Sequence, residues 1–282
     1  MTTDGPTPLE DLLSKSTGPI LLPVIHLFDA EQAVRNARIA FESGCHGVWL
    51  IAHGSNEKRK QTELLIECYN AVRQQWPAAW IGVNVLQMLW KPDDLFGWMM
   101  QHMPTVNGVW TDQCFATKEG TTEHMARIMQ ARARAGFVGV YFGGFAFKHQ
   151  PLLVDSQEGE MTEEDREKLA KLAKAASRFV DVLVTSGTAT GVTPNLVKVQ
   201  TVHDAVHPLH PLALSGAGME LDAFAPHAEI FLAATALQAD CPRHHTIDGC
   251  SASFCNLSPE RVAKWVALAA AIADNRRENS QL

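Results

Sequence analysis

The chain has 282 residues, of which 46% are hydrophobic and 20% are charged, a composition typical of a folded globular protein. Its net charge is −7 and its pI about 5.9, which argues against a nucleic-acid partner, because phosphate-binding surfaces usually carry a basic excess. No apolar run reaches about 18 residues and residues 1–6 lack a basic, apolar signal sequence, so we expect a cytoplasmic protein without a membrane span.

Eight short apolar runs recur along the chain and are separated by segments with helical periodicity. Continuous apolar runs of this length are typical of strands that are buried on both faces. The predicted strands are 19–27, 46–53, 80–86, 108–112, 138–142, 180–185, 211–215 and 228–235. The predicted helices are 30–43, 56–75, 93–102, 121–135, 162–178, 194–206, 220–225 and 258–273.

Capping residues define two of the helix starts. Asp29 is predicted to cap the helix over 30–43, with Gln32 completing a capping box and Gly44 ending the helix. Thr193 is predicted to cap a helix that begins at Pro194, because proline is favoured at the first helical position.

Eight alternating strands and helices predict an α/β fold, a (β/α)8 TIM barrel. We expect a single domain over 1–282, with an irregular loop that contains Cys and His at about 238–257. A doubly wound open sheet is the alternative, but it would normally carry a glycine-rich loop after its first strand, and residues 24–28 contain no glycine. The cysteines are sparse and form no CxxC pair, so we expect reduced thiols. They are Cys45, Cys68, Cys114, Cys241, Cys250 and Cys255.

Polar residues collect at the C-terminal ends of the predicted strands, where TIM barrels carry their active sites. Each of these residues alone could have a purely structural role, either buried with hydrogen-bond partners or exposed on a loop. Their shared placement at one face indicates a site. Histidine titrates near neutrality and an aspartate can orient it, so this set suits acid–base chemistry. The candidate catalytic residues are His26, His53, Asp112, Lys148 and His149.

A second group of residues is predicted to bind substrate. Residues 182–194 run from an apolar strand through small hydroxyl residues and glycines to a predicted helix start, whose free N–H groups suit an anion. The loops after strands seven and eight form the usual phosphate site of such barrels; the first is glycine-rich, whereas residues 233–237 contain no glycine. Asn84 is assigned to orienting the substrate. The other substrate-binding candidates are Thr185, Ser186, Thr190, Gly191, Ser215, Gly216, Gly218 and Thr235.

The sequence does not select a cofactor. A divalent cation among His26, His53, Asp112 and His149 is one alternative, because all four follow strands. A zinc site is another, but its residues lack a paired CxxC spacing. That set is Cys241, His244, His245, Cys250 and Cys255. Lys148 lies several residues past the fifth strand, so a Schiff-base mechanism has little support.

Several of these motifs resemble those of the BtpA family, which also includes SgcQ-type proteins. The resemblance spans nearly the whole chain, and its most specific parts are the Lys-His and Ala-Thr-Gly motifs. The motifs are 23–27, 83–86, 147–149 with 151–152, 182–185 with 189–191, and 215–216. The resemblance to this family implies a barrel of the ribulose-phosphate-binding type. The chain departs from the family pattern after strands two, six and eight, and Gln238 stands where the family tends to have lysine, so the resemblance implies a divergent member.

The combined prediction is an enzyme that acts on a small polar or phosphorylated, sugar- or nucleoside-like substrate by lyase, isomerase or hydrolase chemistry. We expect a homo-oligomer whose partner is a small molecule. The alternative is a non-catalytic assembly or scaffold factor on the same fold, which would present an exposed apolar helix face. The residues considered for that face are Trp98, Met99, Met100, Met103 and Trp265. The substrate and the reaction type stay open.

Overall fold

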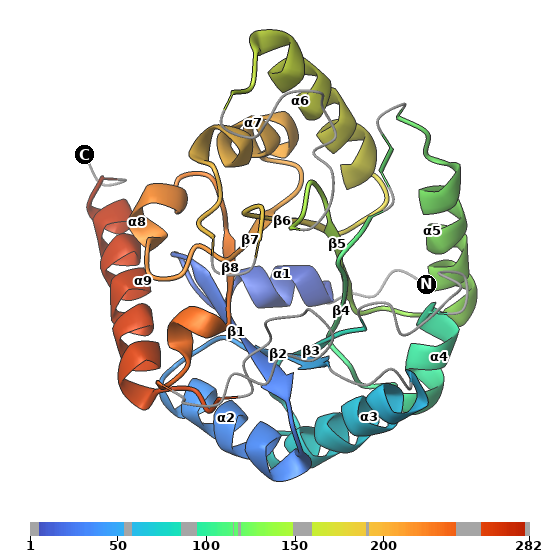
Figure 1. The fold of residues 1–282 in the computed structure, drawn as a ribbon, viewed down its shortest axis with the longest axis vertical. Coiled ribbons are helices and arrows are strands. Elements are labelled where there is room, and N and C mark those ends of the chain that lie inside the picture. Colours follow the sequence, from blue (N-terminus) through green and yellow to red (C-terminus); the bar gives the residue numbers. More distant parts are fainter. Residues whose placement is uncertain are drawn as a thin grey trace.

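The computed structural model describes residues 6–53, 58–85, 95–114, 116–117, 120–148, 160–189, 192–240 and 255–279. Within these ranges eight parallel strands close into a barrel in sequence order (Figure 1). They are β1 Ile20–Leu27, β2 Val48–Ala52, β3 Ile81–Asn84, β4 Gly108–Thr111, β5 Val140–Gly144, β6 Val182–Ser186, β7 Leu212–Ser215 and β8 Ile230–Ala233. The barrel prediction is confirmed and the open-sheet alternative is wrong, because β1 pairs with β8 through Ile20 and Ile230.

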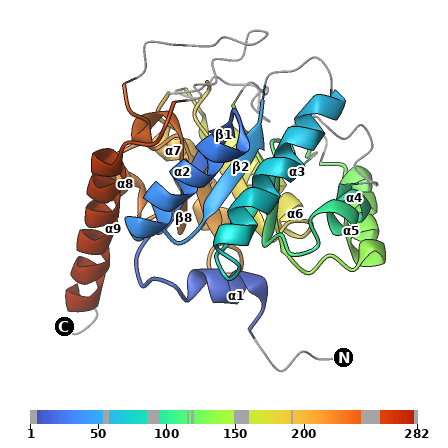
Figure 2. The ribbon, with the colours of Figure 1, turned by 90° about the horizontal axis from the view of Figure 1, so that it is seen from below.

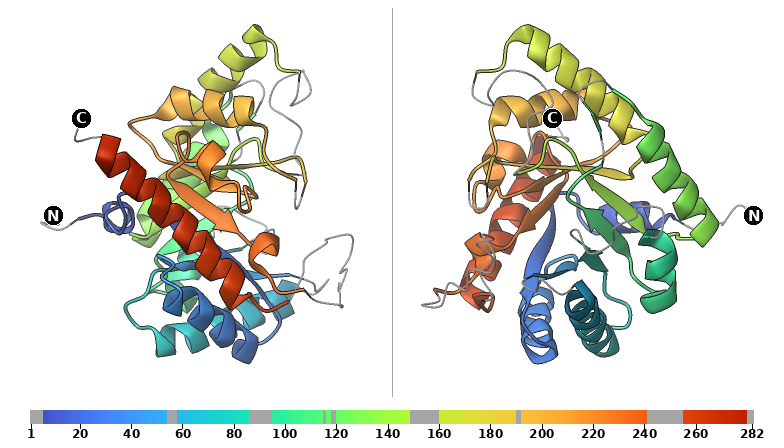
Figure 3. Two further views of the ribbon diagram at one scale, coloured as in Figure 1. Left: turned by 90° about the vertical axis from the view of Figure 1, so that its left-hand side faces the viewer. Right: turned by 45° about the vertical axis from the view of Figure 1, so that its right-hand side comes forward.

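Helices surround the barrel, and α9 lies on its outside between α8 and α2 (Figures 1 and 3). The helices that follow strands are α2 Ala30–Glu42, α3 Lys58–Gln75, α4 Leu95–His102, α5 Glu123–Ala135, α6 Glu163–Ser177, α7 Leu196–Val206, α8 Leu221–Phe224 and α9 Pro259–Asn279. A short 3-10 helix, η2 Thr235–Leu237, follows β8. No helix in the described ranges has the length and apolar character needed to cross a bilayer.

The observed N-cap residue is the predicted one at α2 and a different one at α7. The Asp29 carboxylate accepts a hydrogen bond from the Gln32 backbone N–H at 2.7 Å, as predicted. The Gln32 side chain does not complete a capping box; its amide donates to the carbonyl of His26 at 2.9 Å. The predicted start of α7 at Pro194 is wrong, since Asn195 is the N-cap and accepts from the Lys198 N–H.

One helix was not predicted: α1 Pro8–Leu13, which begins with a capping box between Thr7 and Glu10. The Thr-x-x-Glu spacing was its signal in the sequence. Leu12 is fully buried in the same apolar cluster as Ile20, the first residue of β1. Figure 2 shows α1 lying across one end of the barrel, so it closes the N-terminal end of the strands.

Aromatic side chains fill the barrel interior. The ring of Trp49 meets the rings of Trp80 and Phe142 edge-on, with centroids 5.0 and 4.9 Å apart. Such aromatic pairs contribute about 0.5–1.5 kcal/mol each beyond burial. Gly82 makes room for this cluster, because a Cβ atom there would overlap the Trp49 ring. In the part of the chain that the structure describes, the interior is therefore filled at this level, and we look for a ligand site above the cluster, at the C-terminal ends of the strands.

The apolar helix face considered for a scaffold protein is not exposed. Met99, Met103 and Trp265 are fully buried, and Trp98 and Met100 pack partly buried against the outer core. These side chains hold α4 and α9 to the barrel. The sequence feature that would have supported a scaffold is therefore part of the core.

Three cysteines are free and buried, as expected: Cys45, Cys68 and Cys114. The expectation of reduced thiols is wrong for Cys255, which is disulfide-bonded. Burial raises the pKa of the Cys45 thiol to about 12, so this group is not a nucleophile at neutral pH.

Candidate functional site

The pleat of the strands decides which side chains reach the barrel mouth. Side chains alternate between the interior and the helix-facing side along each strand. Leu22 and Val24 belong to the interior cluster, so the alternation also turns His26 inward. On β2, Trp49 and Ile51 are interior residues, and His53 follows with the same phase. The two histidine rings meet above the aromatic cluster, with centroids 4.7 Å apart.

A cavity of about 330 Å³ opens at the C-terminal ends of β1, β6, β7 and β8 and beside the loop after β5. Seven predicted site residues line it: His26, Lys148, Ser186, Ser215, Gly216, Gly218 and Thr235. Ala189, Thr193, Ala217, Met219, Glu220, Ala233, Ala234 and Ala236 complete its wall. We call this cavity the mouth pocket.

His53 is held as a neutral imidazole beside the mouth pocket. Burial, and then the positive charge of Lys148, lower the pKa of His53 to about 4. Both effects disfavour the imidazolium form. At neutral pH this ring therefore offers one N–H donor and one lone pair next to His26, and the positive charge at this position belongs to Lys148.

Lys148 lies at the pocket and not on a remote loop. Its backbone N–H donates to the hydroxyl of Ser186 at 2.8 Å, which ties the loop after β5 to the end of β6. Its ammonium lies 5.7 Å from the centre of the Phe147 ring. Phe147 is buried in the interior cluster, so the loop that carries Lys148 is anchored on both sides.

A buried lysine that the sequence reasoning missed supports the same two loops. Lys198 is fully buried on α7, and its ammonium donates to the backbone carbonyls of Ser186 and Ala146. Ala146 has a φ of 48°, a left-handed conformation that is uncommon for alanine. Lys198 stands four residues before the buried Val202, on the inner face of α7, but a lysine at this position interrupts the apolar pattern by which a sequence reveals a buried helix face.

Two glycines shape the wall formed by the β7 loop. Gly216 and Gly218 have φ values of 92° and 58°, which L-residues with a Cβ rarely adopt. The Gly216 N–H donates to the carbonyl of Leu232 at 3.2 Å, which joins this loop to β8. Glu220 adds a carboxylate to the same wall, so an anionic ligand group bound there depends on the positive charge of Lys148, which lines the same pocket.

Asn84 and Asp112 meet each other outside the pocket lining. The Asn84 amide donates to the Asp112 carboxylate at 2.9 Å, across the ends of β3 and β4. Asp112 was expected to orient a histidine, but the bond that the structure shows for its carboxylate comes from Asn84. The pair remains part of the same strand-end face, because both residues follow the inward phase set by Trp80 and Trp110.

Thr185 is not brought to the mouth pocket. It is fully buried on the opposite phase from Ser186, and its hydroxyl lies 3.4 Å from the Ala146 carbonyl. Three further site predictions, His149, Thr190 and Gly191, lie outside the described residues.

The described residues bring together only part of each of the two predicted metal-ligand sets. His26 and His53 are adjacent, but Asp112 bonds to Asn84, and the fourth expected ligand, His149, is not described. Of the predicted zinc set, Cys255 is disulfide-bonded and therefore is no thiolate ligand. The other four members lie outside the described residues.

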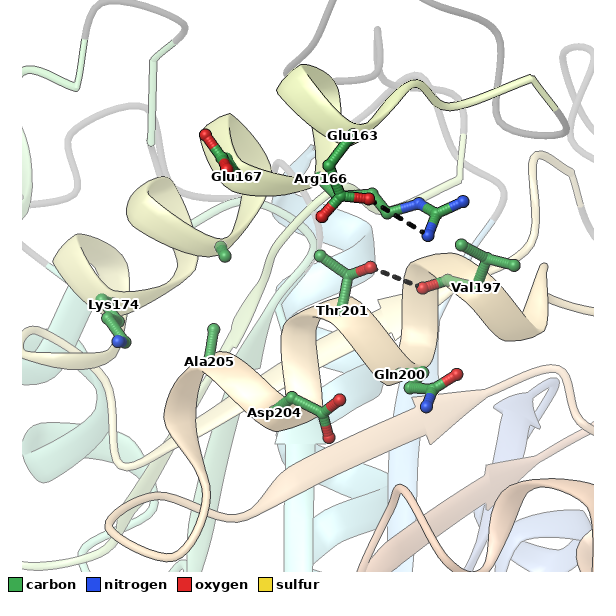
Figure 4. A pocket seen from close by; sticks show the side chains of 10 residues that line it. Glu163, Arg166, Glu167, Lys174, Val197, Gln200, Thr201, Asp204 and Ala205 are labelled. Atoms are coloured by element: carbon green, nitrogen blue, oxygen red, sulfur yellow. Dashed lines mark hydrogen bonds and ion pairs between the residues drawn. The ribbon is translucent and has the colours of Figure 1, made fainter.

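A second cavity of about 410 Å³ lies between α6 and α7 on the outside of the barrel (Figure 4). Its side chains are those of a solvated helix–helix groove: Arg166 pairs with Glu163 at 3.5 Å, and the Thr201 hydroxyl donates to the Val197 carbonyl at 2.7 Å. None of the predicted site residues lines it. The mouth pocket is therefore the better candidate for chemistry.

The fold and this pocket define a (β/α)8 barrel protein with a polar cavity at the strand ends. No protein-family model and no curated protein sequence matches the chain. Among solved structures, (S)-3-O-geranylgeranylglyceryl phosphate synthase from Thermoplasma acidophilum, in complex with its substrate sn-glycerol-1-phosphate, is similar in fold. It is 14% identical with a TM-score of 0.58, covering 96% of this chain and all (100%) of that one.

Two further barrels show the same likeness. Mycobacterium tuberculosis tryptophan synthase is 12% identical with a TM-score of 0.56, covering 94% of this chain and 96% of that chain. The native KDPGal structure is 12% identical with a TM-score of 0.52, covering 93% of this chain and 96% of that chain. At these identities the likeness establishes the fold alone.

Proposed function

We propose that this protein is an enzyme that acts on a small, hydroxyl-rich substrate carrying a phosphate group. The observation that carries the proposal is the composition of the mouth pocket, in which Lys148, His26 and the glycine loop 215–218 line one cavity of about 330 Å³. A concave site with a few convergent polar groups is the usual form of a small-molecule site.

The phosphate is assigned to the wall formed by the β7 and β8 loops. In this fold the loops after strands seven and eight commonly hold phosphate. Gly216 and Gly218 let the backbone approach a ligand closely, and Ser215 and Thr235 supply hydroxyl donors. Lys148 supplies the positive charge of the described lining. Residues 233–237 contain no glycine, whose backbone could approach the phosphate closely. We assign the contact on the β8 side to the Thr235 hydroxyl instead.

The chemistry proposed is proton transfer, as in an isomerase or a lyase. His26 lines the pocket and can take a proton from a carbon or hydroxyl group of the substrate. The Lys148 ammonium can stabilise the negative charge that this removal leaves on a substrate oxygen. His53 is neutral and lies against His26, so it acts as a positioning residue for that ring.

The structural neighbours support the proposal by analogy of fold. The Thermoplasma synthase holds sn-glycerol-1-phosphate as its substrate, so the same architecture accommodates a phosphate ester. Membership of the BtpA family, as a divergent branch, is part of this proposal and rests on the sequence motifs. A homo-oligomeric, cytoplasmic setting with a small molecule as partner belongs to the proposal as well.

Ligand binding tests the assignment. Isothermal titration of the full chain with ribose 5-phosphate, sn-glycerol-1-phosphate and inorganic phosphate should detect binding of at least one phosphate ester, with ribose and glycerol as uncharged controls. Lys148→Ala should weaken that binding by about 10-fold or more, because a charge-assisted contact of about 1.5–3 kcal/mol is lost. Lys174→Ala, an exposed lysine on α6, is the matched control. Equal affinities in both variants would remove Lys148 from the site, and binding of none of the esters would count against a phosphate substrate.

A further inference from the structure

A cluster of histidines and carboxylates lies at the end of the barrel opposite the mouth pocket. His203 is in the last turn of α7, His207 is its C-cap residue, and Glu229 directly precedes β8. One ligand atom from each of these three residues lies within 4.8 Å of the others. Their positions next to the start of β8 place the cluster at the N-terminal ends of the strands, away from the proposed chemistry.

The distances in this cluster are close to those of a metal site. The Nδ1 atom of His207 is 3.6 Å from Glu229 Oε1, and His203 Nε2 is 4.0 Å from the same oxygen. Ligands at about 2.1 Å in a tetrahedral zinc site lie about 3.4 Å from one another. The two distances to Glu229 Oε1 exceed this spacing by about 0.2 and 0.6 Å, so small side-chain movements would bring each histidine to an ion that this oxygen also binds.

Neighbouring groups already orient two of the three ligands. Asp204 Oδ1 lies 3.0 Å from His203 Nδ1, which leaves the Nε2 lone pair of His203 on the side of Glu229. The second oxygen of Glu229 accepts the Leu212 N–H at 2.8 Å, so Oε1 is the one presented to the histidines. A carboxylate on the far nitrogen of a ligating histidine is the usual support of a protein metal site.

A third histidine completes the surroundings. The ring of His227 meets that of His203 edge-on, with centroids 5.5 Å apart, and His227 also groups with His203 and Asp204 in ligand geometry. Its Nδ1 atom is buried and has no hydrogen-bond partner among the described residues. His227 is grouped with His203 and Asp204 and not with His207 or Glu229, so it borders the site without being one of its three ligands.

We propose that His203, His207 and Glu229 bind a divalent transition metal of the zinc class, with solvent at the remaining coordination position. Imidazole and carboxylate donors suit such an ion better than calcium or magnesium, which prefer oxygen. The side chains of these three residues are 13%, 52% and 31% exposed, in that order, so an ion can reach the site from solvent. The ion would link the end of α7 to the junction of β7 and β8, and its role would be structural.

The test is a titration of the full chain, first freed of metal, with Co²⁺ and then Zn²⁺. Co²⁺ should give d–d absorption bands of a site with nitrogen and oxygen ligands, and Zn²⁺ should displace it. Zn²⁺ at 100 times its Kd should raise the Tm by about 5 °C, the shift expected for a ligand that binds only the folded state of a chain of this size. Absence of both effects in the wild type would overturn the proposal.

Variants assign the bands to this cluster. His207→Ala and Glu229→Gln should remove the Co²⁺ bands or weaken Co²⁺ binding by at least about 10-fold, and Asp204→Asn should weaken it about 10- to 100-fold through the lost support of His203. His210→Ala, a nearby histidine outside the cluster, should bind as the wild type does. If His207→Ala keeps wild-type bands and affinity while remaining folded by circular dichroism, the metal is bound elsewhere and the assignment is wrong. Glu229→Gln, which keeps the shape of the side chain, guards against a result caused by misfolding.

Discussion

The ammonium group of Lys198 donates a hydrogen bond to the backbone carbonyl of Ser186, inside the protein and directly behind the mouth pocket. The same ammonium reaches the Ala146 carbonyl at 3.3 Å. One buried cation on α7 thus joins the loop after β5, which carries Lys148, to the end of β6. The geometry of the pocket depends on a residue that does not line it.

Lys198→Met should therefore destabilise the protein by about 2–4 kcal/mol, because it leaves two buried carbonyl groups without their charged donor. Urea unfolding at pH 7 measures the change. Lys174→Met is the control, since that lysine is exposed and a surface substitution should stay within about 0.5 kcal/mol. Similar stabilities for the two variants would mean that the carbonyls find other partners.

Gly216→Ala should cost about 1–2 kcal/mol, because φ is 92° and alanine is strained there even though no atom blocks its Cβ closely. It should also weaken phosphate-ester binding in the same titration used for Lys148.

Gly97→Ala is the control variant, and its expected effect on stability has the opposite sign. That glycine is exposed within α4 with nothing within 4 Å of a Cβ, so alanine should stabilise the helix by about 0.5–1 kcal/mol. Equal effects at both positions would contradict the argument from φ.

The sequence was sufficient for the barrel because parallel strands covered on both faces appear as short apolar runs, and all eight were found. It was not sufficient for the phase of those strands. Both faces of β6 are apolar, so nothing local shows that Val182 and Val184 face inward. Thr185 was therefore treated like Ser186, although it follows the outward phase of Leu183, away from the barrel interior.

Two other features needed the folded chain. Lys198 stands on a stripe of α7 whose other members are apolar, and a lysine there breaks the pattern that identifies a buried face. The four-residue spacing of His203 and His207 is visible in the sequence, but Glu229 reaches them only because β8 starts beside the end of α7. Contacts between elements that are not adjacent in sequence carry no local signal.

The neutral state of His53 predicts a pH dependence of stability. Its pKa is about 4 in the folded protein and near 6.5 in an unfolded chain, so between these values the unfolded chain binds more protons. Stability should therefore fall as the pH drops from 7 toward 4, and the share of His53 between pH 7 and pH 5 is about 2 kcal/mol. His53→Gln should lose about that much less stability over this range in urea unfolding. His210→Gln, at a half-buried position on the loop before β7, should follow the wild type. A His53→Gln profile parallel to that of the wild type would show that the imidazole is not held neutral.

Gly82 tests whether the barrel interior is as full as the aromatic contacts indicate. A Cβ at this position would overlap the Trp49 ring, which is itself held between the rings of Trp80 and Phe142. Gly82→Ala should therefore destabilise the protein by about 1–3 kcal/mol through overpacking. The double variant Gly82→Ala with Trp49→Phe provides space for the added methyl group, so it should be more stable than the sum of the single effects by at least about 0.5 kcal/mol. Thermal and urea unfolding of the four proteins in this cycle give the coupling. Strict additivity would mean that Trp49 can move aside, and that space for a ligand extends deeper into the barrel than the mouth pocket.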